Sequence, residues 1–212
     1  MPVTLALAVV LAWPVDMVHD VEPGKDRFVK LGAIDWAEVE DPTIATAEVM
    51  ETNEVLLTGL KPGRTLVLVY AEGRFAVWRI RVGGKPDEPP LEPAKKACPD
   101  LKHTPKDDPK LTVTIGTEAC AKALAQLFQG DGFTARELEL TFDGKVLQAQ
   151  LKALQAASKK GISSRYVGAG LVLEGEATKA EHRQLLWSLF KKSVGRVALD
   201  DRIDTKTPQS PQ

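Results

Sequence analysis

The stretch LTGLKPGRTLVLVY, residues 57–70, decides how the first half of the chain is interpreted. It places Pro62 and Gly63 directly before a run of β-forming residues, 65–70. Proline presets φ at the first central position of a tight turn, and glycine tolerates the positive φ that can follow. The stretch therefore predicts a strand, a sharp turn and a second strand.

Similar patterns on both sides of this stretch predict a small, sandwich-like all-β domain over residues 15–83. Upstream, Pro23 and Gly24 mark a turn between two short apolar segments, and downstream Gly73 marks a hairpin. After that hairpin, one face of the predicted strand carries Ala76, Trp78, Ile80 and Val82. Alternation at every second residue is typical of a half-buried strand, so core packing is the default interpretation of this face.

Residues 84–110 are rich in proline and charge and show neither a strand period nor a helix period. Such a composition buries too little apolar surface to fold, which predicts a semi-rigid linker. After it, residues 111–204 alternate between strand and helix patterns, and residues 205–212 form a polar tail. The predicted fold class is therefore α+β, with an N-terminal all-β domain and a C-terminal α/β domain.

The first residues, MPVTLALAVVLAWP, form an apolar run that is too short to cross a bilayer. With Val10 and Ala12 at the small positions before a cleavage site, residues 1–14 are interpreted as a secretory signal peptide cleaved near Ala12. Export would place the mature protein in the periplasm or outside the cell. The alternative interpretation is a buried first strand of the mature fold.

Two cysteines, Cys98 and Cys120, bear on the same question. An even pair in an exported protein often forms a disulfide, and here it would clip the linker onto the second domain. Two unrelated thiols are equally compatible with the sequence.

The composition argues against several classes of function. A formal net charge of -1 and a lack of any basic stripe exclude nucleic acid as an expected partner. The histidines, His19, His103 and His182, have no acidic partner at ligand spacing and are interpreted as solvated, so no metal site is expected. With no nucleophile motif and no phosphate-binding loop, we predict no catalytic residue, no cofactor and no enzymatic activity.

The order of the turn and strand residues in the first domain resembles the pilus-assembly and secretin N-terminal domain, over about residues 18–82. The residues that carry this resemblance are Asp41-Pro42-x-Ile44-Ala45, Val49, Leu57, Gly59, Pro62-Gly63-x-Thr65 and Gly73. Members of this family are small β-rich modules of Tad/Flp-type pilus secretins and of related type II and III secretion channels. No secretin channel domain follows in the sequence, so this chain is not expected to form the pore itself.

The second domain resembles a BON-type module from about residue 145 to 203. The resemblance is carried by Leu171-x-Leu173-x-Gly175-x-Ala177, by the amphipathic pattern after it, and by Gly195-x-Val197 leading to Asp201-x-Ile203. Such modules accompany pilus secretin N-terminal domains, and they imply an order of helix, strand, strand, helix, strand.

Together the resemblances imply a non-enzymatic periplasmic protein of a Tad-like pilus or type II/III-related secretion apparatus. Association with the outer membrane is compatible with this interpretation. The protein would bind a secretin or another assembly protein, with a homo-oligomer or ring as one form. The alternative is an envelope protein that binds lipid or cell wall through its BON-like half. We interpret residues 65–70 as an edge strand open to a partner, with a candidate interface of Leu66, Val67, Leu68, Val69, Tyr70 and Trp78.

Overall fold

The computed structural model describes residues 14–71, 73–104, 110–143, 145–146, 152, 161–167, 170–192 and 199–206. All of the predicted signal peptide except Pro14 lies outside these residues, as do residues 207–212 of the predicted tail. Most of the helix expected between residues 145 and 160 also lies outside them. These three predictions therefore stay predictions.

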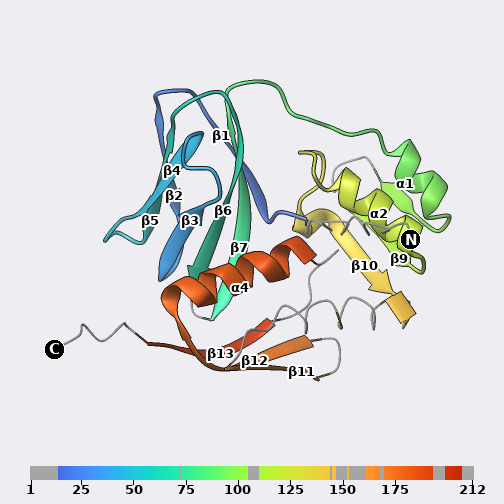
Figure 1. Ribbon diagram of the computed structural model, residues 1–212. Helices are drawn as coiled ribbons and strands as arrows, with labels where there is room; N and C mark the ends of the chain where they lie inside the picture. The colour runs from blue at the N-terminus through green and yellow to red at the C-terminus, as the bar shows by residue number, and fades with distance from the viewer. Residues whose placement is uncertain are drawn as a thin grey trace, which may run out of the picture.

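The first half of the chain forms two sheets that pack face to face (Figure 1). The first sheet has the order β1 (Met17–Val21), β7 (Arg74–Val82), β6 (Gly63–Ala71) and β3 (Trp36–Val39). The second has the order β2 (Asp26–Lys30), β5 (Glu54–Gly59) and β4 (Ala45–Val49). The shared core contains Val21, Ala45, Val55, Leu57, Val67, Val69, Trp78, Ile80 and Val82. The predicted all-β domain is confirmed.

The turns lie at the predicted positions, and they connect different pairs of strands. Gly24, at φ 73°, sends the chain from one sheet to the other, because β1 pairs with β7 while β2 pairs with β5. Gly73, at φ 74°, instead closes the hairpin between β6 and β7, which are neighbours in one sheet. The first turn therefore builds the sandwich, and the second extends one of its sheets.

A second unit follows the β domain. Its sheet has the order β10-β9-β8, and α1 packs beside α2. In chain order its elements are α1 (Glu92–Ala97), β8 (Lys102–Thr104), β9 (Lys110–Ile115), α2 (Glu118–Leu127), the 3₁₀ turn η1 (Ala135–Glu137) and β10 (Leu138–Phe142). Thr117 caps α2, since its Oγ1 accepts a hydrogen bond from the backbone N–H of Cys120 at 3.1 Å.

The expectation that residues 84–110 lack packed structure is wrong, because α1 and β8 lie within them. Pro93 occupies the first turn of α1, where its missing N–H costs nothing. Ala94 and Cys98 are buried in the core of the second unit, with Leu111, Leu124 and Phe128 among their neighbours. Composition alone underestimated the apolar surface that this segment buries.

The third unit consists of β11 (Ile162–Val167), β12 (Gly170–Thr178), α4 (Lys179–Lys192) and β13 (Leu199–Lys206). β11 and β12 are antiparallel, whereas β12 and β13 are parallel and are connected through α4. Thr178 and Glu181 form a capping box at the start of α4, with Glu181 N to Thr178 Oγ1 at 3.2 Å. The predicted order of two strands, a helix and a strand is present, with the last strand extending into the predicted tail.

In Figure 1, α4 lies between the β domain and the sheet of the third unit, and the β6–β7 hairpin reaches down beside it. Apolar residues of all these parts form one continuous core. Its buried members are Val15, Leu68, Val77, Ile162, Leu171, Leu173, Ala177, Leu185, Leu186, Leu189 and Phe190. The β domain and the third unit are therefore packed as one body rather than joined only by a tether.

In the part of the chain that the structure describes, no helix combines the length and the apolar character needed to cross a membrane.

Candidate interaction surface

The strand β6 is an interior strand of its sheet. It pairs with β7 on one side, with Val67 opposite Trp78, and with β3 on the other, with Val67 opposite Val39. The interpretation of residues 65–70 as an open edge is therefore wrong, because β3 occupies the backbone groups that a partner strand would need. A proline in β6 would break the domain itself and could not report on an interface.

The side chains of β6 divide between two different contacts. Val67, Val69 and the cross-strand Trp78 belong to the core of the sandwich. Leu66, Leu68 and Tyr70 lie on the opposite face and pack against the third unit. Leu66, Leu68 and Tyr70 therefore share one side of the strand, and within this chain that side contacts α4 and its sheet.

A buried polar network lies inside the contact between the β domain and the third unit. The Asp201 carboxylate accepts a hydrogen bond from Tyr70 OH at 2.7 Å, and its Oδ2 lies 2.6 Å from His182 Nε2. The Trp36 ring stacks on the Tyr70 ring at a centroid distance of 5.2 Å. The side chains of His182 and Asp201 are only 2% and 0% exposed. The network thus connects β6, α4 and β13 away from solvent.

The environment of this network fixes its charge. Burial acts to raise the pKa of Asp201, but the hydrogen bonds from His182 and Tyr70 hold that pKa below its usual value. Burial and the neighbouring Asp201 carboxylate raise the pKa of the Tyr70 phenol. At neutral pH, Asp201 is therefore an ionised acceptor and Tyr70 a protonated donor. Enclosed in this way, the groups hold two parts of the chain together and do not meet a solvent-borne substrate.

The interpretation of His182 and His19 as solvated histidines is wrong. His182 finds its carboxylate on β13 rather than on its own helix, so helical spacing within α4 could not reveal the pair. His19 is buried against Trp78, with ring centroids 5.0 Å apart, and neither ring nitrogen has a hydrogen-bond partner among the described residues. Burial lowers the pKa of His19 to about 4, with Arg27 contributing in the same direction.

Polar groups of α4 cover the face of β3 that carries Trp36 and Glu38. Glu38 accepts a hydrogen bond from Trp187 Nε1 at 3.1 Å and lies 3.6 Å from Arg183 Nη1. Lys191 Nζ lies 2.5 Å from Glu40 Oε1. This face of the first sheet is thus in contact with α4. In the second sheet, β2 and β4 are the edge strands.

A second contact joins the β domain to the unit that contains α2, and it is built from charges. Arg81 Nη1 lies 3.0 Å from Asp131 Oδ2, and Arg79 Nη1 lies 3.4 Å from Asp131 Oδ1. Arg79 also donates hydrogen bonds to the backbone carbonyls of Phe128, at 3.0 Å, and Gly130. The arginine side chains are 7% and 10% exposed and that of Asp131 is 2% exposed, so this cluster is buried.

Hydrogen bonds keep the acidic member of this cluster ionised. Burial acts to raise the pKa of Asp131, but the N–H of Asp87 and the Arg81 guanidinium hold it below its usual value. Gly130 permits the close approach of the chain here, since a Cβ at this position would clash with Pro89 and lie 2.8 Å from Asp87 O. The sequence GDGF, residues 130–133, forms the turn after α2 and supplies the carboxylate of Asp131.

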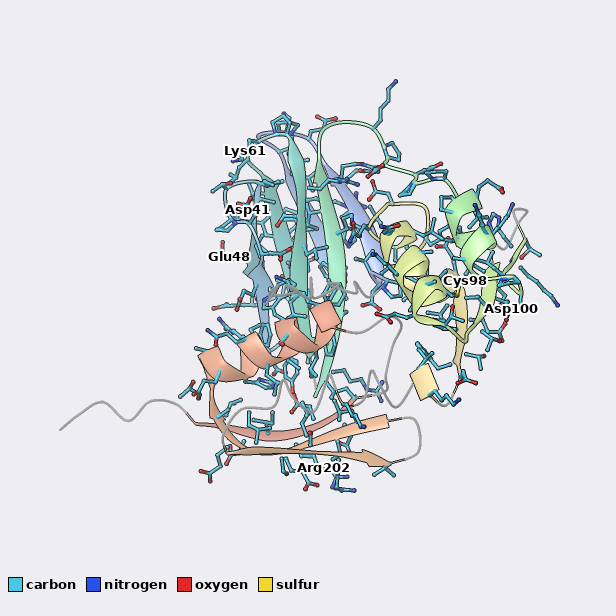
Figure 2. The ribbon with its side chains drawn as sticks, turned by 45° about the vertical axis from the view of Figure 1, so that its right-hand side comes forward. Asp41, Glu48, Lys61, Cys98, Asp100 and Arg202 are labelled. Atoms are coloured by element: carbon cyan, nitrogen blue, oxygen red, sulfur yellow. A yellow bond between two sulfur atoms is a disulfide. The ribbon has the colours of Figure 1, made fainter. Side chains whose placement is uncertain are left out.

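A disulfide links Cys98, just after α1, to Cys120 in the first turn of α2, with the two Cα atoms 5.0 Å apart. Figure 2 shows Cys98 beside Asp100 on the second unit, well away from the strands of the β domain. Of the two alternatives that the sequence left open, the structure thus has the bridge. It fastens part of the predicted linker onto the second unit.

The described residues contain no group of three or more His, Cys, Asp or Glu side chains that could hold a metal ion. Asp41 instead turns its carboxylate to Thr43, whose N–H and hydroxyl donate to it at 2.9 and 2.6 Å. These hydrogen bonds lower the pKa of Asp41. Figure 2 places Asp41, Glu48 and Lys61 along the outer margin of the β domain, remote from Arg202 on the third unit.

Comparison with known proteins gives one family match. The model for the N-terminal region of pilus formation proteins of type II and type III secretion systems matches residues 17–83. No curated protein matches the chain significantly. A crystal structure of domains 4 and 5 of the S-layer protein SbsC aligns with 34% of this chain and 43% of its own, at 14% identity and a TM-score of 0.28, which is too slight to support an inference.

The family match follows the observed domain closely. It begins at the first residue of β1 and ends one residue after β7. Residues 84–206 lie outside it, so the resemblance of the third unit to a BON-type module stays a prediction. Residues 17–83 therefore form a domain of the pilus formation protein N-terminal family.

Proposed function

We propose that this chain is a non-enzymatic component of a Tad-like pilus or a type II/III-related secretion apparatus. In this role its β domain binds a secretin or another assembly protein in the periplasm. The observation that carries the proposal is the agreement between the family match and the complete β domain, from the start of β1 to the end of β7.

Two features of the chain support an envelope location. The Cys98–Cys120 disulfide suits an oxidising compartment, since cytosolic thiols are normally kept reduced. The predicted signal peptide over residues 1–14 provides a route of export. Fractionation of cells that produce the chain, with mass measurement of its N-terminus, checks both points. We expect the periplasmic fraction to hold a chain that starts near residue 13.

A binding role is also consistent with the way the polar groups are used. The most enclosed titratable groups, Asp131, Asp201 and His182, are engaged in contacts between parts of the chain. In the first sheet β6 is interior and α4 covers one face of β3, so we expect a partner to act on the second sheet of the β domain. Its β2 strand carries Phe28, a large apolar side chain that is 59% exposed.

Site-specific photo-crosslinking in the native host tests the proposal. A benzoylphenylalanine at Phe28 samples the β domain, and the same probe at Val167, which is 57% exposed on β11, samples the third unit as a matched control. We expect crosslinks from position 28 to a secretin or a pilus assembly protein, and none of these from position 167.

The other outcomes separate the alternatives. Crosslinks to lipid or cell wall from position 167, without secretion proteins from position 28, would instead favour the envelope-binding role of the BON-like half. Failure of both positions to reach any protein of a pilus or secretion apparatus, in cells that assemble one, would contradict the proposal.

A further inference from the structure

A cavity of about 570 Å³ opens at the end of the β domain nearest η1. Its walls come from four places: the start of β1, the segment after β2, the β6–β7 hairpin and η1. Most of the lining is apolar and includes Met17, Leu31, Val69, Phe75 and Trp78. This volume lies within the range of about 300–1,000 Å³ that is typical of ligand pockets.

The charged residues of the lining differ in the contacts that they make within the chain. Asp16 turns its carboxylate to the backbone, accepting a hydrogen bond from Val77 N at 2.8 Å. Arg74 and Arg136 are both exposed, and neither forms an ion pair with any residue in the described part of the chain. Among the described residues, the cavity therefore combines an apolar interior with two exposed arginines and one carboxylate, so the charged groups of its lining are predominantly basic.

β2 and the residue after it carry exposed apolar side chains. Leu31 is 36% exposed, and Phe28, three residues earlier, is 59% exposed. Leu31 directly follows β2, which is an edge strand of its sheet. A polypeptide segment paired along β2 would therefore end beside the cavity. An edge strand that ends beside the cavity suits a segment of chain better than a small molecule.

We propose that this cavity, the β2-end pocket, binds a partner polypeptide segment that carries a large apolar side chain next to acidic residues. The apolar side chain fills the space between Leu31, Phe75 and Trp78, while the carboxylates pair with Arg74 and Arg136. The inference deepens the proposed function, on which it rests for the existence of a protein partner, and it adds the place and the chemistry of recognition.

Titration of the ¹⁵N-labelled full chain with short peptides tests this pocket by NMR. The probes are acetyl-Asp-Phe-Asp-amide, acetyl-Asp-Ala-Asp-amide and acetyl-Lys-Phe-Lys-amide. We expect the first peptide to shift the amide signals of Leu31, Arg74, Phe75 and Arg136. It should bind about tenfold more tightly than either other peptide, because the second peptide lacks the apolar anchor and the third has the opposite charge.

Charge reversal of the pocket provides the second readout. The double variant Arg74→Glu/Arg136→Glu should invert the preference between the acidic and the basic Phe peptides while the remaining signals keep their positions. Arg202→Glu, a change at an exposed arginine on the third unit, should leave both affinities unchanged.

Three results would overturn the inference: equal binding of all three peptides, shifts confined to another surface, or an unchanged preference in the double variant. Concentration-dependent shifts of the same signals without peptide would also overturn it by identifying a second copy of the chain as the occupant. Because these measurements use the purified chain, they can fail while crosslinking from position 28 succeeds, and the reverse. The two proposals are thus distinguishable.

Discussion

The two contacts that hold the β domain against the rest of the chain are built from different chemistry. Toward α2, the contact centres on Arg79, Arg81 and Asp131, which are buried charges. Toward α4, it is an apolar core with a buried polar network around Asp201 and partly exposed ion pairs beside it. Buried charges depend on every partner being present, whereas an apolar contact weakens in proportion to what is removed. The difference predicts that single substitutions affect the two contacts unequally.

The largest effect is expected from Asp131→Asn, which removes one charge and keeps the shape of the side chain. Arg79 then stays buried without its carboxylate, although Asp20 still pairs with Arg81 at 2.5 Å. We expect the free energy of unfolding to fall by about 3 kcal/mol or more. Urea denaturation followed by tryptophan fluorescence measures this loss.

The matched control is Glu139→Gln. Glu139 pairs with Lys110 at 3.0 Å, but both side chains are more than half exposed, so its denaturation midpoint should not move. Equal midpoints for Asp131→Asn and Glu139→Gln would contradict the view that the first contact depends on its buried carboxylate.

The second prediction concerns the disulfide that supports the unit carrying Asp131. The bridge joins residues 22 positions apart, and a loop of this length predicts a loss of about 3 kcal/mol when both cysteines become alanine. Hydrogen exchange should rise mainly in α1, β8, β9 and α2, because the bridge closes that unit. An equal rise throughout the β domain would show that the charged contact transmits the loss and would contradict this expectation.

The third prediction concerns the pH dependence of stability, which we expect to differ between the core of the β domain and the two contacts. The pKa of His19 is about 4 in the folded protein and 6.5 in its ordinary state, so the unfolded chain binds more protons between these values. The stability contributed by neutral His19 is therefore present above pH 6.5 and is lost as the pH falls toward 4. We expect a loss of about 2 kcal/mol between pH 7 and pH 4.5.

His19→Phe should flatten this range, since neither ring nitrogen has a hydrogen-bond partner among the described residues and the ring packs on Trp78. The pKa values of Asp131 and Asp201 lie below 3.8, so their contributions are lost at lower pH. Unfolding free energies at pH 7, 5.5 and 4.5 check the prediction, and an unchanged slope in the variant would assign the acid sensitivity to other groups.

Local pattern predicted the β domain because its elements are marked by local chemistry. Pro62-Gly63 and Gly73 set the turns, and alternation along β6 separated Leu66, Leu68 and Tyr70 from Val67 and Val69. The helix cap at Thr117 depends on the same kind of short-range signal. These features need only a few neighbouring residues to be specified.

Long-range pairing was not visible in the same way. β3 has four residues, and its pairing with β6 spans a chain segment that folds into the other sheet, so β6 could be mistaken for an edge. His182 and Asp201 meet because β13 returns parallel to β12 after α4. Arg79 and Arg81 are covered by the turn after α2, which is distant from them in the sequence. In each case the missing information was which distant segment supplies the partner.

The smallest effect is expected from Tyr70→Phe, which removes one hydroxyl from the network in the apolar contact. Asp201 keeps His182 and the N–H of Ile203 as donors, so we expect a loss of only about 1 kcal/mol. The double variant with Asp131→Asn then tests the comparison itself. The two sites share no hydrogen-bond or ion-pair partner among the described residues, so their losses should add to within about 0.5 kcal/mol. A coupling energy well above this value would mean that loosening the charged contact also disturbs the apolar one, and that the β domain is held by one cooperative interface rather than two independent ones.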